Sequence, residues 1–175
     1  MKIIAEQSTS TTSSMSDLPD DMREKNLLFF DIETTGLSPE HAEIFLIGAL
    51  SLSRNGAQLH QFFAEKQSEE REILEAFFAF AESYDLLLHF NGRRFDLPFI
   101  RKRCEILGIA NRLSEKEDRD LYQRLKPYRN LLQMESFRQK DVEELVGYPR
   151  TDEMSGSEMV ALYKEYLASP SEAKA

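Results

Sequence analysis

The sequence contains little cysteine and no long apolar run, and each absence excludes a class of protein. With Cys104 as its single cysteine, the chain cannot form an internal disulfide or a zinc site built from several cysteines. Cys104 lies in a helix-like run, where a small buried side chain is more common than a nucleophile. No apolar stretch is long enough to cross a membrane, and residues 3–5 are too short for the hydrophobic region of a signal peptide. We therefore expect a cytoplasmic protein with no membrane partner.

The N-terminal residues lack the apolar content that a folded segment needs. Residues 8–16 are nearly all Ser and Thr, and residues 17–26 add three Asp and one Glu. Such segments cannot bury enough apolar area to offset the entropy of ordering. We predict a flexible tail over residues 1–25, one domain over residues 26–168 and a short disordered C-terminus over residues 169–175.

The sequence also lacks the excess of positive charge that is usual in nucleic-acid-binding proteins. The net charge is −9, but the charges are segregated along the chain. Residues 93–140 carry 13 basic and 7 acidic residues (+6), whereas the remainder carries 9 and 24 (−15). The basic region is consistent either with solvated helix faces or with a surface that contacts phosphates.

Hydrophobic patterns predict an α/β fold with a mixed sheet. Five strands are expected, over residues 27–30, 44–52, 59–63, 86–90 and 120–122. Asn55-Gly56 is a strong hairpin signal between the second and third strands, so the first three should be antiparallel. Helices are expected over residues 69–81 and 97–107, and at two capping boxes, Ser136 with Gln139 and Ser155 with Glu158. This order implies helices packed on both faces of the sheet.

Two carboxylates end the first predicted strand. Because strand side chains alternate between faces, Asp31 and Glu33 point the same way while Ile32 points into the core. Like charges this close repel each other unless a cation lies between them. Oxygen ligands of this kind suit Mg²⁺ or Mn²⁺. A strand can also end in Asp-x-Glu simply because it reaches solvent.

The longer segments around these residues resemble the DEDD family of 3′-to-5′ exonucleases, which have a ribonuclease H-like fold. The segment Phe-Phe-Asp-Ile-Glu-Thr-Thr-Gly-Leu, residues 29–37, is similar to the first motif of the family. The second motif is similar to residues 91–99, in which Asn91 ends a strand and Phe95-Asp96 opens a helix. The step from Asn91 to Asp96 resembles that in proofreading domains of family B DNA polymerases. An Asp before Leu-Pro can also be an ordinary helix N-cap.

Tyr148 and Asp152 resemble the third motif, Tyr-x-x-x-Asp, of the Tyr subtype of this family. At helical spacing the two side chains would share one face. Pro149 disfavours helical geometry at Tyr148, and the Ser155 capping box indicates that the last helix starts after Asp152. Glu153 and Asp120 are the alternatives for the last acidic ligand.

The resemblance implies hydrolysis of single-stranded DNA or RNA from free 3′ ends, by a two-metal mechanism that releases nucleoside 5′-monophosphates. Asp31, Glu33, Asp96 and Asp152 would hold two Mg²⁺ or Mn²⁺ ions, and Tyr148 would orient the attacking water. Substrate contacts are expected from Thr34, Thr35, Leu37, Asn91, Arg93 and Arg94. Two alternatives remain: a ribonuclease H-like domain that binds nucleic acid or protein without cutting, and a structure-specific endonuclease. The sequence does not distinguish DNA from RNA.

Overall fold

A six-stranded open sheet forms the centre of the protein. The computed structural model describes residues 1–7, 18–53, 56–148 and 154–169. The strand order is β1-β4-β3-β2-β5-β6. The strands are β1 Lys2–Gln7, β2 Leu27–Thr34, β3 Ile44–Ser53, β4 Gly56–Phe63, β5 Leu86–His89 and β6 Glu117–Asp120.

Strand β2 separates an antiparallel half of the sheet from a parallel half. β2 pairs antiparallel with β3, β3 with β4, and β4 with β1. On its other side β2 pairs parallel with β5, and β5 pairs parallel with β6. The carboxyl ends of β2, β5 and β6 therefore point the same way. The predicted mixed α/β sheet, with its first three predicted strands antiparallel, is confirmed.

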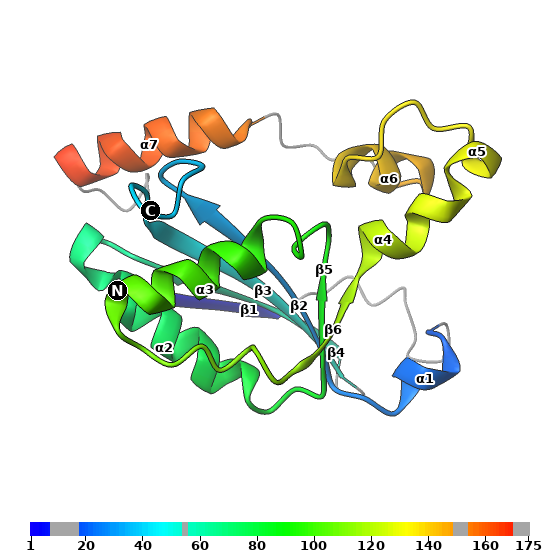
Figure 1. Ribbon diagram of the computed structural model, residues 1–175, viewed down its shortest axis with the longest axis horizontal. Coiled ribbons are helices and arrows are strands. Elements are labelled where there is room, and N and C mark those ends of the chain that lie inside the picture. Colours follow the sequence, from blue (N-terminus) through cyan, green and yellow to red (C-terminus); the bar gives the residue numbers. More distant parts are fainter. Residues whose placement is uncertain (8–17, 54–55, 149–153, 170–175) are drawn as a thin grey trace.

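Seven helices and two short 3-10 turns surround the sheet in the described residues (Figure 1). The helices are α1 Asp20–Arg23, α2 Glu70–Ala81, α3 Asp96–Leu107, α4 Leu121–Leu125, α5 Arg129–Leu132, α6 Gln139–Leu145 and α7 Gly156–Ala168. The turns are η2 Gln67–Glu69 and η3 Lys126–Tyr128. The helices expected over residues 69–81 and 97–107 correspond to α2 and α3.

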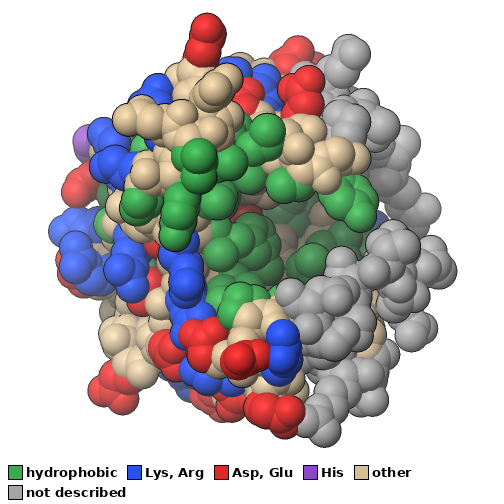
Figure 2. All heavy atoms as spheres, turned by 90° about the vertical axis from the view of Figure 1, so that its right-hand side faces the viewer, with side chains coloured by type: hydrophobic (Ala, Val, Ile, Leu, Met, Phe, Trp, Pro, Cys, Tyr) green, Lys and Arg blue, Asp and Glu red, His purple; other side chains and the backbone are tan. Residues whose placement is uncertain are grey.

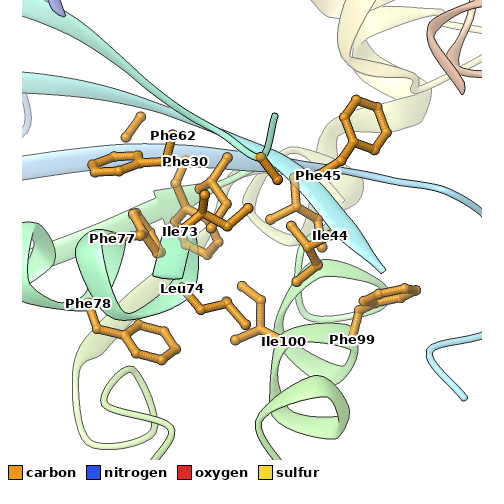
Figure 3. Close-up of a cluster of buried hydrophobic side chains, with 14 of the residues drawn as sticks. Phe30, Ile44, Phe45, Phe62, Ile73, Leu74, Phe77, Phe78, Phe99 and Ile100 are labelled. Carbon is orange, nitrogen blue, oxygen red and sulfur yellow. The ribbon is translucent and has the colours of Figure 1, made fainter. Parts of the chain in front are cut away.

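Helices cover both faces of the sheet, as the neighbours Phe62 and Phe63 of β4 demonstrate. Phe62 packs against Phe77 of α2, whereas Phe63 packs against Tyr163 and Tyr166 of α7. Successive side chains of a strand point to opposite faces, so α2 and α7 lie on opposite sides. Figure 3 shows the larger cluster, in which side chains of β2, β3, β4, α2 and α3 interdigitate.

Four local predictions from the sequence need correction. Residues 2–7 form the edge strand β1, and residues 20–23 form α1, although both lie in the predicted tail. The fifth strand ends at Asp120, and residues 121–122 belong to α4. The capping box of α6 does not join Ser136 and Gln139, because the Asp141 carboxylate accepts from the Arg138 N–H at 3.1 Å. The edge strand was missed because its pairing with β4 is a long-range contact.

The last helix begins as the sequence predicted. Ser155 is the N-cap of α7, and its hydroxyl accepts from the Glu158 N–H at 3.3 Å. The Glu158 carboxylate accepts from the Ser155 N–H at 2.7 Å. This reciprocal pair satisfies two backbone donors that a helix start otherwise leaves unpaired.

Candidate active site

Asp31 and Glu33 lie at the end of β2 on the same face of the sheet. Ile32 between them is buried on the opposite face, as the alternation predicts. Asp31 is exposed and Glu33 is half-buried. The residue paired with Asp31 on β3 is Gly48, which has no side chain to cover the carboxylate. This face of the strand end is therefore open to a ligand.

Asp96 reaches the same strand end from the first turn of α3. Strand β5 pairs with β2 only as far as Phe29, so beyond that point the edge of β2 needs another partner. The Ile32 N–H donates to Asp96 Oδ1 at 3.2 Å. The backbone between Asp31 and Glu33 thus fixes the position of the third carboxyl group, which is only 5% exposed.

The carboxyl groups of Asp31 and Asp96 are close enough to change each other's protonation. Burial, the charge of Asp31 and a hydrogen bond between the two side chains raise the pKa of Asp96 to about 7. Two carboxylates share one proton in this way when nothing positive lies between them. The donor set therefore fits a hard divalent cation, which would remove the repulsion and keep both groups ionised.

The turn that follows β2 is held by its own hydrogen bonds. Thr34 is buried, and its hydroxyl donates to the Gly36 carbonyl at 2.8 Å. The Thr35 N–H donates to the Glu43 carbonyl at 2.9 Å, while the Thr35 hydroxyl accepts from the Glu43 N–H at 3.0 Å. A substrate that bound the Thr35 backbone N–H would therefore have to replace its hydrogen bond to the Glu43 carbonyl. Leu37, in contrast, is 85% exposed.

Asn91 lies in the loop that joins β5 to Asp96, and Asp120 holds that loop in place. Asn91 adopts a left-handed conformation with φ of 62°. Its N–H donates to Asp120 Oδ1 at 2.9 Å, and the Arg93 N–H donates to Asp120 Oδ2 at 3.4 Å. Asp120 is buried and is also the N-cap of α4. Asp120, weighed from the sequence as a metal ligand, here anchors the loop.

Arg93 and Arg94 differ in their surroundings. Both side chains are exposed, but Arg93 Nε donates to Asp118 Oδ1 at 2.8 Å. The same carboxylate oxygen lies 3.0 Å from His89 Nε2, and the ring of His89 is fully buried. Arg93 therefore extends a network on β5 and β6, so Arg94 fits the expected phosphate contact better.

Gly92 is a position that the sequence analysis did not single out. A Cβ atom at Gly92 would lie 2.8 Å from the ring of His89, which is shorter than any ordinary contact. The Gly92 N–H donates to His89 Nδ1 at 3.2 Å. A small residue is needed here because the loop passes directly over a buried ring. The Asn-Gly pair was the available signal, but it was interpreted only as a strand end.

The third motif lies in the connection between α6 and α7. Tyr148 follows α6, is 66% exposed and is not helical, so the helical face expected from the four-residue spacing does not form at Tyr148. Its N–H donates to the Glu143 carbonyl at 2.8 Å. Asp152 and its alternative Glu153 lie outside the described residues. Within the described ranges, the Asp31 and Asp96 carboxyl groups contact each other, and Glu33 lies on the same face as Asp31. Among the described residues, no group of three or more His, Cys, Asp or Glu side chains lies close enough to hold a metal ion.

Comparisons with known proteins agree with this fold. A family model described as the RNase H superfamily matches residues 28–175. None of the curated protein sequences matches the chain. Among solved structures, the chain is similar to the family B DNA polymerase from the hyperthermophilic archaeon Pyrobaculum calidifontis, with a TM-score of 0.64 and 19% identity. The likeness covers 86% of this chain but 21% of the polymerase, so this chain corresponds to about a fifth of that protein.

The structural match supports the fold alone, because the identity is low. No helix in the described part of the chain has both the length and the apolar character that a membrane span requires.

Proposed function

We propose that this chain, which belongs to the RNase H superfamily, is a metal-dependent 3′-to-5′ exonuclease acting on single-stranded DNA or RNA. The observation that carries the proposal is the contact between Asp31 and Asp96. The two residues come from different elements, and the hydrogen bond from the Ile32 N–H to Asp96 holds the two carboxyl groups side by side. Placing like charges together costs free energy, and a bound cation would offset that cost. Residues 26–168 would form the catalytic domain.

Each residue of the site would have a separate role in the reaction. Asp31, Glu33 and Asp96 would hold Mg²⁺ or Mn²⁺, and Asp152 would complete the ligand set. Two such ions, when bound, would supply a water activated for attack and charge that stabilises the leaving 3′ oxygen. Tyr148 would orient the attacking water. The products would be nucleoside 5′-monophosphates.

The substrate would enter along the edge formed by the carboxyl ends of β2, β5 and β6. Leu37 is exposed next to the carboxylates, where it can contact the terminal base. Arg94 can contact a phosphate, and Asn91 can position the strand. Ligands commonly bind outside the carboxyl ends of strands where the direction of the connections changes, and β2 is such a point in this sheet.

The comparisons support a nuclease more strongly than a domain that only binds nucleic acid or protein. The matched solved structure is a family B DNA polymerase, the class whose proofreading domains share the step from Asn91 to Asp96. A domain that only binds nucleic acid or protein would have little reason to keep two like charges together at Asp31 and Asp96. A structure-specific endonuclease would use the same carboxylates. Closed circular strands distinguish the two enzymes, because an endonuclease cuts them and an exonuclease does not.

The decisive experiment uses single strands of DNA and RNA labelled at the 3′ or 5′ end, with and without Mg²⁺ or Mn²⁺. We expect release of labelled mononucleotide from the 3′-labelled strand and a ladder of shortened products from the 5′-labelled strand. Asp31→Asn should lower the rate at least about 10³-fold, because metal ions supply several kcal/mol of charge stabilisation. Activity that survives both metal removal and this substitution would overturn the mechanism.

A matched control and a second readout separate metal binding from general damage. Glu75→Gln removes an exposed carboxylate that pairs only at the surface with Arg71, and we expect no loss of activity. Mg²⁺ at about one hundred times its dissociation constant should stabilise the wild-type fold by about 2.7 kcal/mol. Mg²⁺ should not stabilise the Asp31→Asn variant. If Mg²⁺ raises the unfolding temperature of both proteins equally, the metal binds at a site that does not include Asp31.

A further inference from the structure

A groove of about 560 Å³ lies beside the candidate active site, at the carboxyl ends of β5 and β6. It is bordered by Phe90 and Asn91 after β5, by Tyr122 of α4, by Arg129 of α5, and by residues 135–139, which lead into α6. Figure 2 looks onto the end of the molecule that carries this groove, where hydrophobic side chains are exposed with Lys and Arg beside them. The groove lies between the loop after β5 and the helical extension, which we define as residues 121–148.

Three aromatic rings line the groove in a row. The rings of Phe90 and Tyr122 lie 5.9 Å apart between centroids, and those of Tyr122 and Phe137 lie 6.5 Å apart. Both pairs are nearly perpendicular, and all three residues are half-buried. Each ring is therefore fixed by its neighbours but still has accessible surface toward the groove. Aromatic surfaces of this kind bind unpaired bases by stacking.

Positive charge surrounds the rings. The guanidinium of Arg129 lies 6.0 Å from the centroid of the Phe137 ring. Arg138 also lines the groove, and its side chain is 66% exposed although it pairs with Asp141. The helical extension as a whole, residues 121–148, contains five basic and four acidic residues, so its net charge is +1 in a chain of net charge −9. The positive groups of Arg129 and Arg138 lie at the rings themselves, where a negatively charged ligand would contact them.

Asn91 connects the groove to the carboxylates. It lines the groove, and its loop continues directly to Asp96. Its side-chain Oδ1 atom is buried and has no hydrogen-bond partner among the described residues. Buried polar atoms are rarely left without a partner, so this acceptor is suited to a donor from a ligand. An exocyclic amino group of a base is such a donor.

We infer that the groove binds unpaired bases of the strand whose 3′ end lies at Asp31 and Asp96. The direction of the bound strand, with its 3′ end at the carboxylates, rests on the proposed function. The inference adds the surface that holds the nucleotides upstream of the cleaved bond. Phe90, Tyr122 and Phe137 stack against the bases, while Arg129 and Arg138 contact the phosphates. The protein therefore selects single strands over duplexes, because paired bases present no free faces.

The test measures binding of a fluorescent single strand of about twelve nucleotides, within the range of known single-strand binding sites. All variants are made in the Asp31→Asn background, so that the strand is not cut. Phe137→Ala should weaken binding about tenfold, and Phe137→Tyr, which keeps a ring, should stay within about twofold of the parent. The matched control is Leu131→Ala, which removes an exposed apolar side chain of the same extension that does not line the groove.

The outcomes separate the inference from the proposed function. Equal binding by Phe137→Ala and its parent, or equal losses in Phe137→Ala and Leu131→Ala, would overturn the groove assignment. In the active protein, Phe137→Ala should lower the preference for the longer strand over a dinucleotide about tenfold, and an unchanged preference would also overturn it. If no strand is hydrolysed but Phe137→Ala still weakens binding, the groove stands and the exonuclease proposal fails.

Discussion

The sheet body and the helical extension differ in how their apolar side chains are used. In the body, side chains such as Phe30, Ile73 and Phe77 are fully buried between the sheet and α2. In the extension, by contrast, no residue is fully buried, and Tyr128, Leu131 and Val146 are between 55% and 78% exposed. In Figure 1 the extension projects beyond the ends of β5 and β6, on the right of the view.

The body and the extension would have different functions. The body supports carboxyl groups whose positions must be fixed closely, and a buried ion pair helps to hold it together. Arg103 Nε donates to Glu70 Oε1 at 2.8 Å and its Nη1 donates to the Pro39 carbonyl at 2.8 Å, which ties α2, α3 and the turn after β2 to one another. The extension has no comparable core, so its shape depends on local turns and ring contacts. We expect a rigid site beside an adaptable strand-binding surface.

The largest effect on stability should come from the body. Phe77→Ala removes a fully buried ring that packs against Phe30, Phe62 and Phe78. We expect it to lower the free energy of unfolding by about 3–5 kcal/mol, since it leaves a cavity between the sheet and α2. Denaturant unfolding followed by circular dichroism measures this loss. A loss below about 1 kcal/mol would mean that the body is not the rigid part of the molecule.

An intermediate effect should come from the loop between β5 and α3, whose residue Asn91 borders the groove. Gly92→Ala places a methyl group against the His89 ring, so the loop from Asn91 to Asp96 must shift. We expect a cost of about 1–3 kcal/mol together with loss of nuclease activity. Gly108→Ala is the matched control, because Gly108 has φ of 63° but no atom within 4 Å of an added Cβ. It should cost about 1 kcal/mol and leave activity unchanged. Equal activity of the two variants would contradict the proposed role of the loop.

The smallest effect should come from the extension itself. Leu131 is 78% exposed on α5, so Leu131→Ala should change the free energy of unfolding by less than about 0.5 kcal/mol. Thermal unfolding of Leu131→Ala and Phe77→Ala under the same conditions compares the loss of stability in the two regions. A loss above about 1 kcal/mol would show that the extension packs as tightly as the body, and the comparison between the two regions would fail.

The elements that local patterns encode were predictable from the sequence. Periodicity located α2 and α3, and the Ser155 capping box located the start of α7, since these signals come from neighbouring residues. The edge strand β1 was missed, because six residues with an exposed Ile3 are ordered only by pairing with β4. The shift of the fifth strand has the same kind of cause, because pairing with β5 places β6 at residues 117–120.

For the candidate site, alternation along one strand was sufficient to put Asp31 and Glu33 on one face. The sequence and its resemblance also identified Asp96 and Asn91 as candidates. The roles of Tyr148 and Asp152 stay predictions.

By itself, the sequence determined the kind of fold and put Asp31 and Glu33 on one face, because strand alternation and helix periodicity depend on near neighbours. Its resemblance to the DEDD family supplied the rest of the proposed metal ligands. Only the tertiary structure decided how these residues meet. The ending of β5 leaves the Ile32 N–H for Asp96, Asp120 anchors the loop at Asn91, and the rings of the groove come together from three separate segments. Such contacts depend on where distant segments end relative to one another, and no local pattern in the sequence records that.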